Sequence, residues 1–285
     1  AAMRDRGWTE GRDLVIEKFG SKFGGDLQLA DAAQRVVASK PDLIITISTA
    51  YALALQRATG SIPIVMVSSG YPVEAGAADS LSKPGRNVTG NALYATTGVW
   101  GKMLQLLHDV KPGIDQVCVL WTYVVPAFPK EEIEPCYAEL KSAARALGLK
   151  LNIVEVSESN QLQAAFAEID AEKPDGLLLT SLFTPEGLSV VTRFAADKRL
   201  PTIIDVDWAP FGVSPLPLLS YGPDFHDLVR RAAASVDKIL RGAKAGEVPI
   251  QNPDRFEMIV NLKTARAIGL SLPASFLLLA SKVNE

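Results

Sequence analysis

The chain has 285 residues, of which 48% are hydrophobic and 21% charged, and its formal net charge is -3. This composition is typical of a globular protein, and it gives no electrostatic case for binding nucleic acid or an anionic membrane. No apolar stretch is long enough to span a bilayer. The length suits two lobes, or one large α/β domain, better than one small core.

The first seven residues are typical of the end of a helix, with Gly7 as its stop. A doubly wound sheet needs a strand before such a helix, so we expect that strand to precede residue 1. No secretory signal is visible within the chain.

Short apolar runs then alternate with helical patterns. Near-continuous apolar runs, typical of buried parallel strands, lie at residues 43–47, 64–67, 117–120, 177–179 and 203–204. Amphipathic patterns predict helices over residues 26–39, 130–147 and 224–240, the last with Asp224 as its N-cap. This alternation predicts parallel sheets covered by helices.

The alternation occurs twice, from about residue 13 to 93 and from about 115 to 206. A turn-rich segment at 84–90 separates the strands and helices of the first series from those of the second, and a second break at 209–215 follows the second series. We therefore predict an α/β fold of two Rossmann-like lobes joined by a hinge. The first lobe is expected to comprise residues 1–94 and 222–255, and the second residues 95–221 and 256–285. Small ligands favour the cleft between such lobes and the carboxyl ends of parallel strands.

Motifs for common enzyme chemistry are missing from the sequence. It contains no glycine-rich phosphate loop, no nucleophile elbow and no H-E-x-x-H zinc motif. His108 and His226 both fall inside expected helices, where a surface or packed role is favoured over that of a general base. Cys118 and Cys136 are expected to be buried thiols, with a strand-to-helix disulfide as the alternative.

Residues that directly follow the expected strands are candidates for ligand binding. They are Ser48, Thr49, Ser69 and Tyr71 in the first lobe, and Trp121, Tyr123, Ser181, Phe183, Asp205, Asp207 and Trp208 in the second. Hydroxyls and helix N-terminal amides suit a carboxylate, and an aspartate suits an ammonium group. The aromatic side chains suit an apolar or aromatic ligand body.

Each group of candidates has a structural alternative. Ser48 and Thr49 could cap the helix that starts near Tyr51, and Trp121 and Trp208 could be core aromatics. The two aspartates could be solvated turn residues.

Seven stretches, taken together and in order, resemble the ABC-transporter substrate-binding proteins of the tryptophan/tyrosine-importer type. They are residues 7–12, 40–44, 62–65, 84–90, 219–222, 236–244 and 260–265. The resemblance implies a type I periplasmic-binding-protein fold with three hinge crossings. It also implies export by a signal peptide, either free in the periplasm or lipid-anchored, and delivery of a ligand to an ABC permease and its ATPase.

Relatives of this type bind aromatic amino acids, need no cofactor or metal, and are expected to be monomers. This chain departs from the family pattern at Trp121-Thr122-Tyr123, where Trp-Asn-Pro is frequent, and at Asp205-Val206-Asp207, where an Asn is absent. An aromatic or other small carboxylate without an amine is therefore an alternative ligand.

Two other functions stay open at this point. One is the ligand-sensing domain of a cytoplasmic regulator with the same fold, although no DNA-binding module is visible. The other is an α/β enzyme acting in the interlobe cleft, for which Asp205 and Asp207 would be the first candidates.

Overall fold

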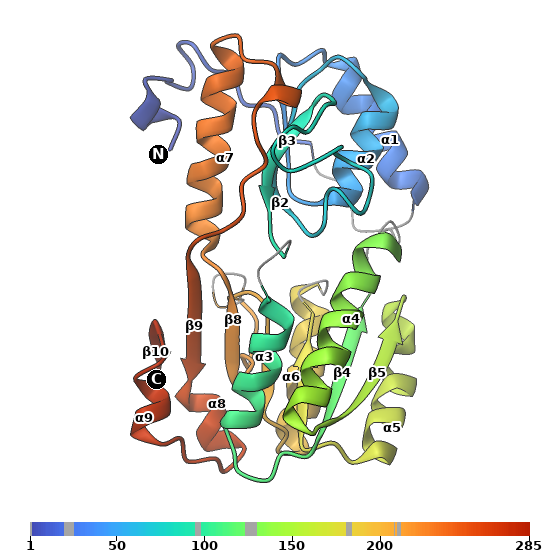
Figure 1. Cartoon of the computed structure of the whole chain (residues 1–285), viewed down its shortest axis with the longest axis vertical. Helices are drawn as coiled ribbons and strands as arrows, with labels where there is room; N and C mark the ends of the chain where they lie inside the picture. Colours follow the sequence, from blue (N-terminus) through green and yellow to red (C-terminus); the bar gives the residue numbers. More distant parts are fainter. Residues whose placement is uncertain are drawn as a thin grey trace. The chain divides into compact units, whose positions relative to one another are not determined.

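The computed structural model describes residues 2–19, 26–94, 98–122, 130–180, 184–207, 209 and 212–285, without the side chains of residues 26–28, 130–132 and 159. The chain divides into two compact units (Figure 1). Unit 1 comprises Ala1–Thr97, Pro126–Glu134 and Asp224–Arg255, and unit 2 comprises Gly98–Val125, Pro135–Pro223 and Phe256–Glu285.

Unit 1 contains a parallel three-stranded sheet in the order β1-β2-β3. Helix α7 packs against β2 and β3, whereas α2 packs against β2 and against α1, so the sheet lies between two helical layers (Figure 1). The elements are α1 (Asp26–Ala38), β1 (Ile44–Thr46), α2 (Thr49–Ala58), β2 (Ile64–Ser69), β3 (Val88–Ala92) and α7 (Phe225–Leu240), with short 3-10 helices at Arg4–Arg6 and Ala245–Glu247.

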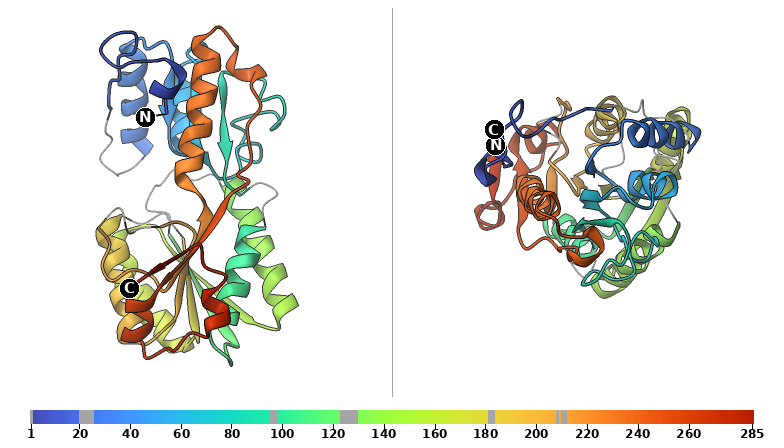
Figure 2. Two further views of the ribbon diagram at one scale, coloured as in Figure 1. Left: turned by 90° about the vertical axis from the view of Figure 1, so that its left-hand side faces the viewer. Right: turned by 90° about the horizontal axis from the view of Figure 1, so that it is seen from above.

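Unit 2 contains a seven-stranded sheet in the order β10-β9-β8-β7-β6-β4-β5, parallel except that β8 and β9 are antiparallel. Helices α3 and α4 lie on one side of this sheet and α5 and α6 on the other (Figure 2, left). The elements are α3 (Val99–Asp109), β4 (Gln116–Thr122), α4 (Lys130–Leu147), β5 (Lys150–Val156), α5 (Leu162–Glu172), β6 (Gly176–Leu179), α6 (Pro185–Asp197), β7 (Thr202–Ile204), β8 (Leu219–Pro223), β9 (Phe256–Asn261), α8 (Leu262–Ala267), α9 (Ala274–Leu277) and β10 (Lys282–Asn284), with a 3-10 turn at Ser159–Gln161.

All five predicted strands and all three predicted helices are present. Strands such as β6 form because their apolar side chains leave water on both faces of the sheet, as Leu177, Leu178 and Leu179 do. Asp224 caps α7 as predicted, its carboxylate accepting the backbone N–H of Asp227 at 3.1 Å. The alternation of strands and helices thus confirms the α/β fold class.

The segment at residues 84–90 differs from its prediction as a turn-rich break. Its last residues begin β3, whose five residues are all buried although Thr, Gly and Asn are weak strand formers. Gly90 has φ 134°, and a Cβ at this position would collide with the backbone of Met66 in β2. Glycine at this position therefore allows β3 to lie close to β2, although the composition of residues 84–90 is typical of a turn.

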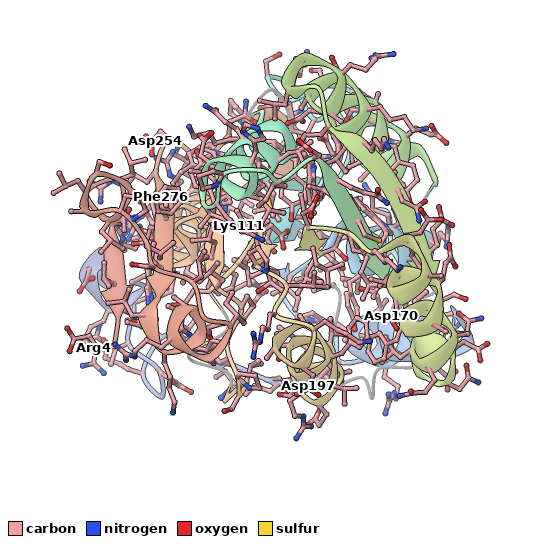
Figure 3. The ribbon with its side chains drawn as sticks, turned by 90° about the horizontal axis from the view of Figure 1, so that it is seen from below. Arg4, Lys111, Asp170, Asp197, Asp254 and Phe276 are labelled. Atoms are coloured by element: carbon pink, nitrogen blue, oxygen red, sulfur yellow. The ribbon has the colours of Figure 1, made fainter. Side chains whose placement is uncertain are left out.

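The two cysteines and the two histidines lie in helices and strands. Cys118 and Cys136 are buried and are not joined by a disulfide, and burial raises the pKa of the Cys118 thiol to about 12. Both histidines lie in helices as predicted, with His226 exposed on α7. Charged side chains cover the outside of unit 2, where Asp170 and Asp197 project from α5 and α6 (Figure 3).

Candidate functional site

The predicted hydroxyl residues of unit 1 meet at the N-terminus of α2. Ser48 is the N-cap of this helix, and its hydroxyl accepts the backbone N–H of Tyr51 at 3.4 Å. The hydroxyls of Thr49 and Ser69 lie 2.5 Å apart, and both side chains are buried. Three hydroxyls from two neighbouring strand ends are thus held beside the positive end of a ten-residue helix.

Ser48 caps α2, which confirms the structural alternative that the sequence left open for this residue. Capping does not use all the donors at a helix N-terminus, because the first four N–H groups lack intrahelical partners. An anion could be held by the remaining amides and by the hydroxyl pair. Ligand contact by Ser48, Thr49 and Ser69 therefore stays a prediction, and the geometry suits a carboxylate.

Tyr71 follows β2 and is buried against a second tyrosine. Its ring centroid lies 6.0 Å from that of Tyr94, at an interplanar angle of 44°. Backbone pairing places Tyr94 there, since the N–H of Leu93 donates to the carbonyl of Ser69 at 2.5 Å. Sequence reasoning missed Tyr94 because β3, which leads to it, was taken for a turn.

In unit 2 the strand order places a switch point between β4 and β6. From β4 the chain passes through α4 to β5 on one side of β4, and then through α5 to β6 on the other side. A crevice outside the carboxyl ends of the strands is expected at such a point. The hydroxyls of Thr122 and Thr180 lie there, 3.2 Å apart and buried. Neither threonine was predicted as a site residue.

Trp121 lies in the aromatic core of unit 2. It is only 3% exposed, and its ring lies 5.3 Å from that of Trp100 and 5.0 Å from that of Tyr137. These contacts support the core alternative, and its ligand contact stays a prediction. Its indole N–H is buried without a hydrogen-bond acceptor, which is unusual for a buried donor.

The two aspartates after β7 have different surroundings. Asp207 accepts the backbone N–H of Ala209 at 2.9 Å and lies 3.8 Å from the Lys282 ammonium, so it has the partners expected of a turn residue. Asp205 is 2% exposed, and its backbone is approached by Gly222 of β8 so closely that a Cβ there would collide with it. Ligand contact by either aspartate stays a prediction, with Asp205 the more deeply buried of the two.

Four of the predicted site residues lie outside the described residues: Tyr123, Ser181, Phe183 and Trp208. In the described part of the chain, no group of three or more His, Cys, Asp or Glu side chains is arranged to hold a metal ion. Helices within the described ranges are all too short or too polar to cross a bilayer.

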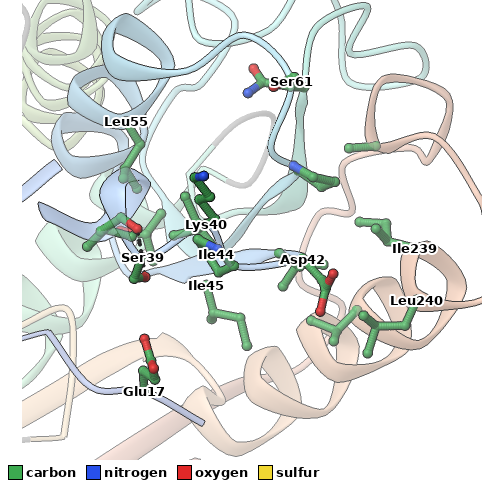
Figure 4. A pocket seen from close by; sticks show the side chains of 18 of the residues that line it. Glu17, Ser39, Lys40, Asp42, Ile44, Ile45, Leu55, Ser61, Ile239 and Leu240 are labelled. Atoms are coloured by element: carbon green, nitrogen blue, oxygen red, sulfur yellow. Dashed lines mark hydrogen bonds between the residues drawn. The ribbon is translucent and has the colours of Figure 1, made fainter. Parts of the chain in front are cut away.

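A cavity of about 1290 Å³ lies within unit 1, but none of the candidate ligand residues lines it (Figure 4). Its walls are formed by residues 13–17, by β1 and the segment before it, and by the last turns of α7. It therefore follows the side of β1 rather than the carboxyl ends of the strands, where the hydroxyl cluster lies.

Comparison with known proteins decides the family. A family model described as ABC transporter substrate binding protein matches residues 1–284. The chain belongs to the ABC transporter substrate-binding protein family. A tyrosine-binding protein of Clostridioides difficile is 28% identical over 272 residues, which cover 94% of this chain and 74% of the relative.

Two solved structures share the fold of this substrate-binding protein. A conserved domain protein from Vibrio cholerae superposes with a TM-score of 0.86 at 23% identity, covering 99% of this chain and 92% of the other. A domain from Streptococcus pneumonia in complex with L-Trp gives a TM-score of 0.86 at 22% identity, covering 99% of this chain and 91% of the other. The fold is thus that of the type I periplasmic binding proteins, as the resemblance implied.

Proposed function

We propose that this substrate-binding protein binds an aromatic amino acid, or an aromatic carboxylate close to one, and delivers it to an ABC permease. Two relatives that match over nearly the whole chain support this ligand class, one named for tyrosine and the other bound to L-Trp. The alternatives, a regulator's sensing domain and an enzyme, lack the support that the family match gives to transport.

The hydroxyl cluster of Ser48, Thr49 and Ser69 carries the proposal. A carboxylate needs donors that do not have to reorganise, and buried hydroxyls fixed beside a helix N-terminus are such donors. Thr49 and Ser69 are 0% and 1% exposed, so water competes weakly with a ligand there. We propose that this cluster holds the ligand carboxylate.

The remaining contacts follow from the same strand-end positions. We propose that Asp205 pairs with the ligand ammonium group and that Tyr71, with Tyr94 beside it, contacts the aromatic ring. Tyr123, Ser181, Phe183 and Trp208 remain proposed contacts on sequence grounds alone. If the ligand lacks an amine, only the proposed contacts to its carboxylate and ring apply.

We propose that the bound ligand stabilises a closed state of the protein, for which it has a higher affinity than for the open state. No bond is made or broken in this process, and no cofactor is needed. We propose that the protein works outside the cytoplasm as a monomer, free in the periplasm or lipid-anchored, and that a permease and an ATPase complete the importer.

Isothermal titration calorimetry tests the ligand class. We expect saturable 1:1 binding of L-tyrosine or L-tryptophan, and loss of binding for the methyl ester of the same amino acid. The difference in affinity between the amino acid and its deaminated acid, which keeps the ring and the carboxylate, gives the contribution of the ammonium group to binding. Failure of every aromatic amino acid and every aromatic acid to bind the folded protein would overturn the proposal.

A further inference from the structure

Three segments of unit 1 continue directly into unit 2. One follows β3, one immediately precedes α7, and the third ends at Arg255. If a ligand stabilises a closed state, as proposed above, the change between states is absorbed in or near such segments, because hinge motions take place in a few loop or element-terminal residues. The contacts that hold each segment within unit 1 therefore influence this change.

The third of these segments has no regular secondary structure. Residues 252–255 belong to no helix or strand, and Gln251 before them forms an isolated bridge with Asn91 of β3. A segment of this kind gains little from a backbone ladder, so side-chain contacts decide how firmly it is held. It runs beside the first turns of α7 (Figure 1).

One arginine joins this segment to α7. Arg231, in the second turn of α7, donates to the carboxylate of Asp227 at 2.5 Å and forms an ion pair with Asp254. Its guanidinium also donates to the side-chain oxygen of Gln251 at 3.4 Å. A planar guanidinium carries five N–H donors, which allows it to bind groups of the helix and of the segment at the same time. We call Arg231, Asp227 and Asp254 the Arg231 clamp.

Burial separates the Arg231 clamp from an ordinary surface ion pair. The side chains of Asp227 and Arg231 are 11% and 23% exposed, so salt screens their interaction less than that of fully exposed charges. Hydrogen bonds from Arg231 lower the pKa of Asp254, and hydrogen bonds to Asp227 and Asp254 raise the pKa of Arg231. The clamp is therefore fully charged at neutral pH.

Two further contacts tie the segments to the same turns of α7. The N–H of Asp224, which caps α7, donates to the carbonyl of Arg255 at 3.0 Å. The side chain of Asn91 in β3 is 1% exposed and donates to the carbonyls of Val67 at 2.7 Å and Leu228 at 2.9 Å. All three segments are thus attached to the N-terminal turns of α7, two of them by side chains.

We propose that Arg231 is a positioning residue for the change between the open and closed states. It holds residues 252–255 against α7, so that both segments move as one body and the change is confined to residues beyond them. This role rests on the closure named in the proposed function, and not on the identity of the ligand. Without the clamp, residues 252–255 would move independently of α7, and a ligand would have to order a broader ensemble.

The neighbouring arginine provides a matched control. Arg230 pairs with the same Asp227 carboxylate at 2.9 Å, but this i,i+3 pair lies within α7 and does not involve residues 252–255. Arg230→Met therefore removes one cation from Asp227 without releasing the segment, whereas Arg231→Met does both. Each variant leaves Asp227 one arginine, so no buried carboxylate is left unpaired and α7 is expected to fold in both.

Pulsed electron–electron double resonance on the ligand-free protein is the primary measurement. Spin labels are attached at Gln34→Cys on α1 of unit 1 and at Ala146→Cys on α4 of unit 2, both exposed helix positions. The natural thiols of Cys118 and Cys136 are buried, which disfavours their labelling. The width of the label-to-label distance distribution then reports the range of arrangements that the two units sample.

We expect Arg231→Met to broaden this distribution about twofold and Arg230→Met to leave it unchanged. Asp254→Asn, at a side chain that is 68% exposed, breaks the same bridge without risk to the fold and should broaden the distribution equally. The double variant should broaden it no further than either single variant, because both remove one interaction. Absence of broadening in either Arg231→Met or Asp254→Asn would overturn the proposal, and so would equal broadening in Arg230→Met.

Calorimetric titration with L-tyrosine and L-tryptophan gives a second measurement. We expect affinity to fall about fivefold in Arg231→Met and to be unchanged in Arg230→Met. Arg231→Lys should be intermediate, because an ammonium group is a point charge that does not bridge two carboxylates in the fixed geometry of a guanidinium. Unchanged affinity in Arg231→Met would contradict the role. If neither amino acid binds, the proposed ligand class fails, whereas the spin-label distances still decide the role of Arg231.

Discussion

The sheets of the two units differ in how completely they are covered. In β6 of unit 2 every residue is buried, and helices lie on both faces of the sheet, whereas in β1 of unit 1 Ile45 is 55% exposed. Both units come from the same alternation of apolar runs and amphipathic helices. An apolar run therefore does not by itself show that both faces of its strand are buried, since β1 alternates between buried and exposed residues whereas β6 does not.

The strand ends of the two units also differ in chemistry. Unit 1 offers buried hydroxyls at the N-terminus of α2, which suit an anion, and unit 2 offers the buried carboxylate of Asp205, which suits a cation. An amino acid carries both charges. The second and third of the four predictions below test this division, and the first and fourth test the packing and the titrating groups of the two units, from the largest expected effect to the smallest.

Gly222→Ala should have the largest effect, because the packing of unit 2 leaves no room for a Cβ beside the backbone of Asp205. We expect a loss of about 3 kcal/mol in the free energy of unfolding, measured by urea denaturation. Gly101→Ala is the control, since a Cβ there makes only an ordinary contact of 3.4 Å with Ala143. Equal effects of the two substitutions would show that unit 2 is less tightly packed than described.

Asp205→Asn and Asp207→Asn should show which of the two aspartates after β7 contacts the ligand ammonium group. Loss of a buried charge opposite an ammonium group costs about 2–3 kcal/mol, so we expect affinity for L-tyrosine or L-tryptophan to fall about 30- to 150-fold by calorimetry. Affinity for the deaminated acid should not fall. Asp207→Asn, at the residue already paired with Lys282, should change neither affinity. A loss confined to Asp207→Asn would reverse the assignment.

Thr49→Val should weaken carboxylate binding in unit 1 while keeping the side-chain shape. One hydrogen bond to a charged group contributes about 1.5 kcal/mol, so we expect about a tenfold loss of affinity for both the amino acid and its deaminated analogue. Thr192→Val, at a buried helix residue whose hydroxyl donates to the carbonyl of Leu188 at 3.0 Å, controls for buried hydroxyl loss. Unchanged affinity in Thr49→Val would remove the hydroxyl pair from the site.

The smallest effect is an opposite response of the two units to acid. The hydrogen bond from Trp8 and the ion pair with Arg241 lower the pKa of Asp237 in unit 1, so its stabilisation is complete above about pH 4 and is lost as pH falls through the folded pKa. Burial raises the pKa of Glu139 in unit 2, so the protonated form favours folding and this contribution is lost as pH rises.

Thermal melts at pH 7 and pH 3 check this contrast. Asp237→Asn should lower the Tm by about 1–2 °C at pH 7 and by less at pH 3. Glu139→Gln should leave the Tm equal or slightly higher at pH 7, because its amide oxygen can still accept the N–H of Gly101. A fall in Tm at pH 7 for Glu139→Gln would contradict the assigned direction.

Sequence reasoning succeeded where one physical effect dominates. Runs such as 64–67 are apolar because both faces of their strand are buried. The carboxyl ends of such strands meet at one edge of the sheet, so the sequence predicts that Thr49 and Ser69 lie close together, as they do. It failed at β3, where glycine permits a close approach to Met66 that no hydrophobic pattern reveals. Because β3 was not predicted, Tyr94 at its end was not predicted as a candidate residue either.

Thr180 was missed for a different reason. The loop after β6 was taken to begin at Ser181, one residue later than the hydroxyl that actually meets Thr122. Exact strand ends depend on backbone pairing across the sheet, which a single sequence does not specify. The difference between Asp205 and Asp207 depends likewise on tertiary neighbours, namely Gly222 and Lys282.

Calorimetric titration of the protein with L-tyrosine and L-tryptophan, alongside the Thr49→Val, Asp205→Asn double variant, tests the central claim most directly. The account predicts saturable 1:1 binding of at least one of these amino acids and a loss of affinity of more than 100-fold in the double variant. Native-like melting of the double variant without ligand would show that the loss arises at the site. Unchanged affinity in a folded double variant would contradict the account.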